Sequence, residues 1–292
     1  MYSAIRANKR NTVIIMMVFL LLIGGLGALA GYLYDDYFIT GLVLFIAIIY
    51  ALIEYFAASR MAISMAGGRE IKKQDNPALW NVVENLAIAN GQPMPRVFII
   101  DDLSPNAFAT GRNPQHSYVA ATTGLLQLMD KRELTGVMAH EMSHVKNYDI
   151  RVSMIVFGLV SAVAFISDFF MRMAWFGGDS DDDDNGLAML IFGLVAAILA
   201  PIVAGLVQLA VSRQREYLAD SSAALLTRDP EGLAMALRKL QANSRPMRRQ
   251  NTAMAHLYIN NPLRSGFFSR IFSTHPPIED RIARLQKIGG EV

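Results

Sequence analysis

Two histidines with a glutamate beside them are the residues best suited to chemistry: His140, Glu141 and His144. On an α-helix, side chains four positions apart share a face and lie about 6 Å apart, so both imidazoles could bind one metal ion. Zinc prefers imidazole nitrogen in a tetrahedral shell, and a third protein ligand would leave one position for water. Glu141 would then be the general base for attack of that water on a carbonyl carbon. The pattern predicts zinc-dependent hydrolysis; the alternative is a chance match on an amphipathic helix.

The residues around this motif predict the helix that it requires. Asp130 followed by Glu133 is typical of a capping box at a helix start. The run from there to Val145 contains no proline and only one glycine, Gly136. The chain also lacks cysteine, so a metal site must be built from His, Asp or Glu.

Composition favours a membrane protein. Of the 292 residues, 53% are hydrophobic and only 18% are charged, which is apolar for a soluble protein of this size. The net charge of +2 is too small to indicate a nucleic-acid partner.

Two uncharged segments predict a transmembrane hairpin within residues 1–57. Asn11–Tyr34 carries no charge over 24 residues, and a second apolar run, Tyr37–Ile53, follows almost at once. This second run argues against a cleaved signal peptide. Lysines and arginines flank the hairpin, whereas its turn is acidic, so the positive-inside rule places both flanks in the cytoplasm.

Residues 58–151 are predicted to form the first part of a cytoplasmic catalytic domain. We expect a helix that begins at Asn76-Pro77, short strands at Arg96–Ile100 and Ser117–Thr122, and an extended segment at Asn106–Gly111. Because helices dominate the remainder, the predicted fold class is mainly α with a small β-sheet.

Residues 152–212 predict a second transmembrane hairpin, which makes four spans in all. Val152–Ser167 is uncharged but short for a span, and Asn185–Ser212 is uncharged over 28 residues. The loop between them contains Asp181–Asp184, which suits the outer side of the membrane. We interpret it as a solvated loop rather than a calcium site, because consecutive aspartates repel and lack the spacing of a calcium loop.

Four spans return the chain to the cytoplasm, where residues 213–292 would complete the catalytic domain. Glu216 and Asp220 are four residues apart and share a helical face. We assign Glu216 as the third metal ligand, and Asp220 as the carboxylate that bonds the free ring nitrogen of a ligating histidine. Either acid could in principle reach the metal. The alternative is an ordinary charged helix in which Arg213 or Arg215 pairs with Glu216.

Four stretches together resemble the HtpX family of bacterial membrane metalloproteases, which carry a gluzincin motif and are related to the CAAX prenyl proteases. They are His140–His144, Glu216–Asp220, Asn106–Gly111 and Thr274–Pro277. The resemblance covers nearly the whole chain. It implies a zinc endopeptidase of the bacterial plasma membrane, with one zinc ion per chain and an active site that faces the cytoplasm. Its substrates would be damaged or misassembled membrane proteins, in quality control and stress response.

The resemblance also implies how substrate binds. Asn106, Ala107 and Phe108 would belong to an edge strand along which the backbone of a protein substrate pairs. The alternative is an ordinary buried strand.

His275 is the remaining histidine of interest. A donor near the zinc could stabilise the tetrahedral oxyanion, and we expect Arg281 to assist it. A structural helix cap is the competing interpretation of His275, because Pro276 follows it.

Two other function classes fit less well. An inactive membrane chaperone with a vestigial zinc site would have no need of Glu141. A transporter would need its ionisable groups inside the apolar segments, whereas the His and Glu candidates all lie outside them. The expected partners are therefore protein substrates and the lipid bilayer.

Overall fold

The computed structural model of the chain describes residues 2–33, 35–161, 213–263 and 276–290. Within these residues the protein is mainly helical with one small mixed sheet, as predicted. The predicted second transmembrane hairpin lies outside the described residues except for 152–161, and so do the acidic loop and His275. The third and fourth spans therefore stay a prediction, because most of their residues lie outside the described ranges.

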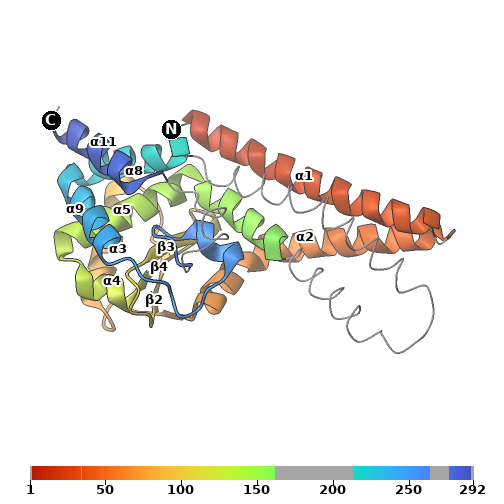
Figure 1. Cartoon of the computed structure of the whole chain (residues 1–292), viewed down its shortest axis with the longest axis horizontal. Coiled ribbons are helices and arrows are strands. Elements are labelled where there is room, and N and C mark those ends of the chain that lie inside the picture. The colour runs from red at the N-terminus through yellow and green to blue at the C-terminus, as the bar shows by residue number, and fades with distance from the viewer. Residues whose placement is uncertain (1, 34, 162–212, 264–275, 291–292) are drawn as a thin grey trace.

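A hairpin of two long helices extends away from the rest of the molecule (Figure 1). They are α1 (Tyr2–Leu33) and α2 (Tyr37–Ala66). The segments Ile5–Gly25 and Thr40–Ala66 are long and apolar enough to cross a membrane. Helix α2 continues past the predicted domain boundary at residue 57, and ends where Gly67 takes a left-handed conformation with a φ of 75°.

The sheet has the strand order β1-β2-β4-β3. Its strands are β1 (Gly68–Glu70), β2 (Arg96–Ile100), β3 (Ala107–Asn113) and β4 (His116–Thr122). β2 and β4 are parallel, and the two outer pairings are antiparallel. The two predicted strands and the predicted extended segment are therefore present, and β3 lies at an edge.

Side chains of the sheet alternate between two apolar cores, as the period of a strand requires. Val97 and Val119 pack into a core that the helices of the catalytic domain complete. Phe98 and Phe108 point to the opposite face, into a core shared with α1, α2 and the helical residues 149–161. The sheet thus separates the first core from a second core that is continuous with the helical hairpin.

Six helices surround the first core and the sheet. They are α3 (Pro77–Asn90), α4 (Thr123–Leu128), α5 (Lys131–Asn147), α8 (Arg213–Thr227), α9 (Pro230–Ala242) and α11 (Ile278–Gly290). A short 3-10 helix, η1 (Thr252–Leu257), lies between α9 and α11 in the chain and packs in the second core.

Helix α5, which carries both motif histidines, lies at the centre of this arrangement (Figure 1). The predicted capping box is present, with Asp130 and Glu133 each bonded to the backbone of the other. Gly136 lets α9 pack closely, because a Cβ atom there would lie 2.8 Å from the backbone nitrogen of Leu233. The helix ends at Tyr148, a non-glycine residue in the left-handed region with a φ of 62°.

Candidate metal centre

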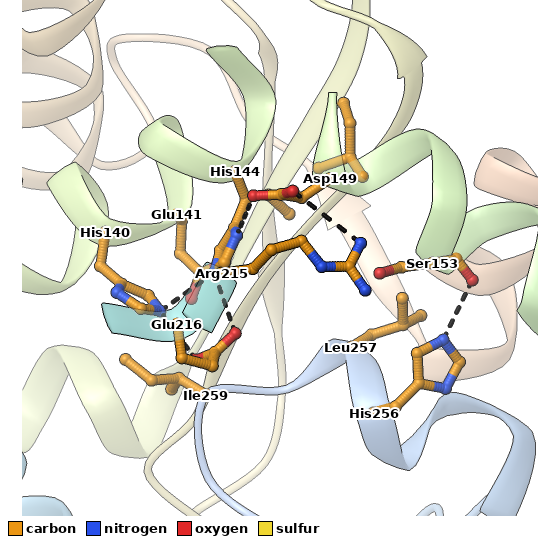
Figure 2. Close-up of a pocket in the computed structure, with 12 residues that line it drawn as sticks. His140, Glu141, His144, Asp149, Ser153, Arg215, Glu216, His256, Leu257 and Ile259 are labelled. Atoms are coloured by element: carbon orange, nitrogen blue, oxygen red, sulfur yellow. Dashed lines mark hydrogen bonds and ion pairs between the residues drawn. The ribbon is translucent and has the colours of Figure 1, made fainter. Parts of the chain in front are cut away.

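The rings of His140 and His144 converge on one point, to which Glu216 also extends from α8 (Figure 2). The two Nε2 atoms are 3.2 Å apart, and the rings are perpendicular at 90°. The Glu216 carboxylate lies 3.5 Å from Nε2 of His140 and 3.4 Å from Nε2 of His144. Packing of α8 on α5 thus brings residue 216 beside residues 140 and 144, which are far from it in the sequence.

These three side chains fit a zinc ion. With zinc–ligand distances of about 2.0–2.1 Å and tetrahedral angles, donor atoms should lie about 3.3 Å from one another. The two Nε2 atoms are 3.2 Å apart, and each has a Glu216 oxygen near that spacing: Oε2 at 3.5 Å from His140 and Oε1 at 3.4 Å from His144. Two imidazoles and one carboxylate are also a donor set that zinc commonly takes.

Each of the two histidines has a carboxylate at its other ring nitrogen. Asp220 Oδ1 lies 2.9 Å from Nδ1 of His140, and Asp149 Oδ2 lies 2.9 Å from Nδ1 of His144. Such contacts hold a ring so that Nε2 faces the metal position. Asp220 therefore lies where the sequence predicted, whereas Asp149 was missed. The available signal was its place just beyond the end of the histidine helix.

Arg281 supports the first of these carboxylates from α11. Its Nε and Nη2 atoms donate to the two Asp220 oxygens at 2.8 and 2.7 Å, and its side chain is fully buried. A two-pronged pair of this kind fixes both the position and the orientation of a carboxylate. The guanidinium also reaches toward the ligands, with Nη1 3.9 Å from the Glu216 carboxylate, and assistance of Arg281 to an oxyanion stays a prediction.

The charges of the site influence one another strongly. Burial and the Arg281 charge lower the pKa of His140, but hydrogen bonds to Asp220 and Glu216 outweigh them and raise it to about 9. Burial raises the pKa of Asp220, but the charge and hydrogen bonds of Arg281 outweigh this and lower it to about 2. Asp220 is consequently a carboxylate at any physiological pH.

A cavity of about 30 Å³ opens in front of the histidines. Glu141 lines it, is only 2% exposed, and follows directly after one candidate ligand in α5. Arg215 and His256 form another part of the wall (Figure 2). Arg215 lies 3.9 Å from Asp149, and His256 bonds the carbonyl of Ser153 at 3.0 Å.

The start of the candidate substrate strand is fully covered. Asn106 is 0% exposed and bonds the backbone of Asn260 through both its amide nitrogen, at 2.8 Å, and its oxygen, at 3.1 Å. Phe108 is also 0% exposed and packs edge-to-face on Tyr258. Ala107 lies between them with 1% exposure. The side chain of Asn106 thus links the residue before β3 to the segment around Asn260.

Comparison with known proteins places these features in a family context. The family model described as peptidase family M48 matches residues 73–289. The Protease HtpX homolog of Tropheryma whipplei (strain Twist) is 56% identical over 293 residues, covering 100% of this chain and 99% of the relative. The corresponding Streptococcus gordonii protein is 48% identical, covering 99% of this chain and 100% of the relative.

A solved structure resembles the fold. The crystal structure of S. mikatae Ste24p superposes with a TM-score of 0.52 at 18% sequence identity. The match covers 96% of this chain and 66% of the length of Ste24p.

Proposed function

We propose that His140, His144 and Glu216 hold the single zinc ion of this chain. The chain belongs to peptidase family M48 and is a zinc-dependent membrane metalloprotease of the HtpX type. The observation that carries this proposal is the convergence of the ligand atoms of the three side chains within 4.8 Å at the cavity that Glu141 lines. The alternative of an inactive chaperone gains no support, because the complete ligand set and Glu141 are present together.

The proposed reaction divides its work among these residues. Zinc supplies Lewis-acid chemistry for the attack of water on the carbonyl carbon of a peptide bond. Glu141 accepts a proton from the attacking water and delivers it to the amine nitrogen as the carbon–nitrogen bond breaks. Asp220 and Asp149 keep the two imidazole rings oriented throughout.

We place the substrate backbone along β3 beyond the covered residues 106–108. The backbone nitrogen of Ile259 donates to the oxygen of Ala107 at 3.0 Å, so the peptide groups of Ala107 face away from β4. Alternate residues of a strand share that direction, so Ala109 and Gly111 face the same edge. Because Tyr258 forms an antiparallel bridge with Phe108, we place the substrate beyond that bridge, toward Gly111. Ala109 also lines the cavity. Pairing there would bring an extended substrate past the metal position with little demand on its sequence.

We also propose that the catalytic domain is cytoplasmic, that residues 152–212 add two further spans, and that misfolded membrane proteins are substrates. The charge pattern on the two sides of α1 and α2 supports the orientation. Single cysteines at Tyr37, which is 74% exposed, and at Lys73 test it in this cysteine-free chain. In intact cells, an impermeant maleimide should label Tyr37→Cys and not Lys73→Cys. The reverse labelling would contradict the orientation.

Replacement of the proposed base tests the chemistry. Glu141→Gln should leave zinc content unchanged, because the ligands remain, and lower casein cleavage at least about 100-fold, because the base is lost. Zinc content and cleavage should be measured on the same purified preparation, with His140→Ala as the matched variant that loses the metal. Cleavage at the parent rate by Glu141→Gln would refute the mechanism.

A further inference from the structure

Asn8, near the start of α1, is a buried polar residue on a helix whose next residues, Lys9 and Arg10, are exposed. Its side chain is 3% exposed, so its amide must find partners within the protein. Figure 1 shows the N-terminal end of α1 beside α8, next to the catalytic helices. Asn8 therefore belongs to the contact between the membrane hairpin and the catalytic domain.

The amide of Asn8 is bonded to the metal-site carboxylate that the sequence had not revealed. Its Nδ2 donates to Asp149 Oδ1 at 2.6 Å and to the carbonyl oxygen of Asn147 at 2.9 Å. Its Oδ1 accepts from Nη1 of Arg215 at 3.4 Å. Asp149 uses its other oxygen, Oδ2, to bond Nδ1 of His144 at 2.9 Å. A continuous path of hydrogen bonds thus runs from α1 to the ring of a proposed zinc ligand.

The turn after α5 makes this path possible. Tyr148 in the left-handed conformation ends the helix and returns the chain, so that the carboxylate of residue 149 reaches back to His144. The outer oxygen, Oδ1, accepts from Asn8 at 2.6 Å, and Nη1 of Arg215 lies 3.9 Å from it.

We propose that Asn8 is a positioning residue of the metal centre: it fixes Asp149, which in turn orients His144 toward the metal. Helix α1 then helps to orient a zinc ligand in addition to anchoring the protein in the membrane. This inference rests on the proposed function in one respect, namely that His144 is a zinc ligand.

A purely structural role for Asn8 makes a different prediction. Its bond to the carbonyl of Asn147 also satisfies one of the last carbonyl groups of α5. If Asn8 only capped α5, its removal would weaken the protein equally whatever residue stood at position 149. If Asn8 acts through Asp149, its removal should have no further effect on the metal once that carboxylate is gone. A double-mutant cycle separates the two roles.

The experiment uses the full-length protein in detergent and Zn²⁺ as the probe. Zinc affinity is measured by competition with a chelator, and the visible spectrum of the Co²⁺-substituted protein reports ligand geometry. Asn8→Ala should lower zinc affinity on the order of tenfold and shift the cobalt bands. Asn11→Ala, the same change three residues along the helix, should leave both as in the parent. In an Asp149→Asn background, Asn8→Ala should change zinc affinity by less than about twofold.

Each other outcome overturns the inference. Unchanged zinc affinity in Asn8→Ala, an equal loss in Asn11→Ala, or independent losses in the double mutant would show that Asn8 does not act through Asp149. If Asn8→Ala does not fold, the nearly isosteric Asn8→Asp, which places one carboxylate against another, should show the same loss, and a parent-like affinity would refute the proposal. Failure of the proposed function is distinguishable, because His144→Ala would then keep the zinc affinity of the parent.

Discussion

Each of the two proposed histidine ligands bonds a carboxylate through Nδ1, but different kinds of residue hold the two carboxylates. Each histidine has a carboxylate 2.9 Å from its Nδ1 atom. Asp220, behind His140, is held by the fully buried charge of Arg281 from the C-terminal helix. Asp149, behind His144, is held by the neutral amide of Asn8 from the N-terminal membrane helix. One metal centre thus depends on both ends of the described chain.

The difference follows from the surroundings of the two sides. His140 is 1% exposed in the interior, where a buried carboxylate needs a full counter-charge. His144 is 15% exposed at the cavity; its carboxylate partner, Asp149, is 5% exposed and has the charge of Arg215 3.9 Å away beside the amide of Asn8, so its counter-charge is more distant than that of Asp220. We therefore expect the His140 side to tolerate change least.

Replacement of Glu216 should lower zinc binding most, because its carboxylate lies close to both His140 and His144. Glu216→Ala should yield protein without zinc, because a ligand is lost. Asp220→Ala should weaken zinc binding about 10 to 100-fold, with partial rescue by added zinc. Metal analysis after dialysis measures both. A metal-free Asp220→Ala beside a zinc-loaded Glu216→Ala would reverse the assignment of ligand and support.

The next largest effect is a loss of stability when a buried ion pair is broken, compared with an exposed one. Arg281→Leu leaves Asp220 buried without its counter-charge and should lower the free energy of unfolding by about 3–5 kcal/mol. Arg132 makes the same two-pronged contact with Asp229 at the surface, where the arginine side chain is 51% exposed. Arg132→Leu should change stability little. Chemical denaturation of both variants measures the difference, and equal losses would contradict the assigned importance of burial.

The smallest expected effect concerns pH. Because the pKa of His140 is raised to about 9, its ring holds a proton at neutral pH when no metal is bound, and zinc must displace that proton. Apparent zinc affinity should therefore rise with pH, on the order of tenfold per unit, and level off near pH 9. Asp220→Asn removes a cause of the raised pKa and should move the plateau to lower pH. A plateau already present at pH 7 in the parent would contradict the prediction.

The sequence predicted the parts of the site that depend on local spacing. His140 and His144 share a face because four residues separate them on a well-capped helix, and Glu216 and Asp220 share a face for the same reason. The strands were equally visible as short runs bounded by turn residues, although β1 was not predicted.

The parts that were not predicted depend on contacts between distant segments or on unusual backbone. Asp149 reaches His144 only because Tyr148, which is not a glycine, takes a left-handed conformation. Asn8 is separated from Asp149 by 141 positions, and no periodic pattern marks it. The pairing of Arg281 with Asp220 likewise joins residues 61 positions apart, and it depends on the packing of α11.

The burial of the proposed catalytic groups bears on which states of a target protein can be cleaved. His140 is 1%, Glu141 2% and Glu216 4% exposed, so the surface of a folded domain cannot bring a peptide bond to them. A target must therefore present an extended segment, which a native protein does only through local unfolding. When such openings close faster than cleavage occurs, the cleavage rate follows the population of the open form. A target destabilised by about 1.4 kcal/mol would be cut about ten times faster, so the protease would discriminate by conformational stability rather than by sequence.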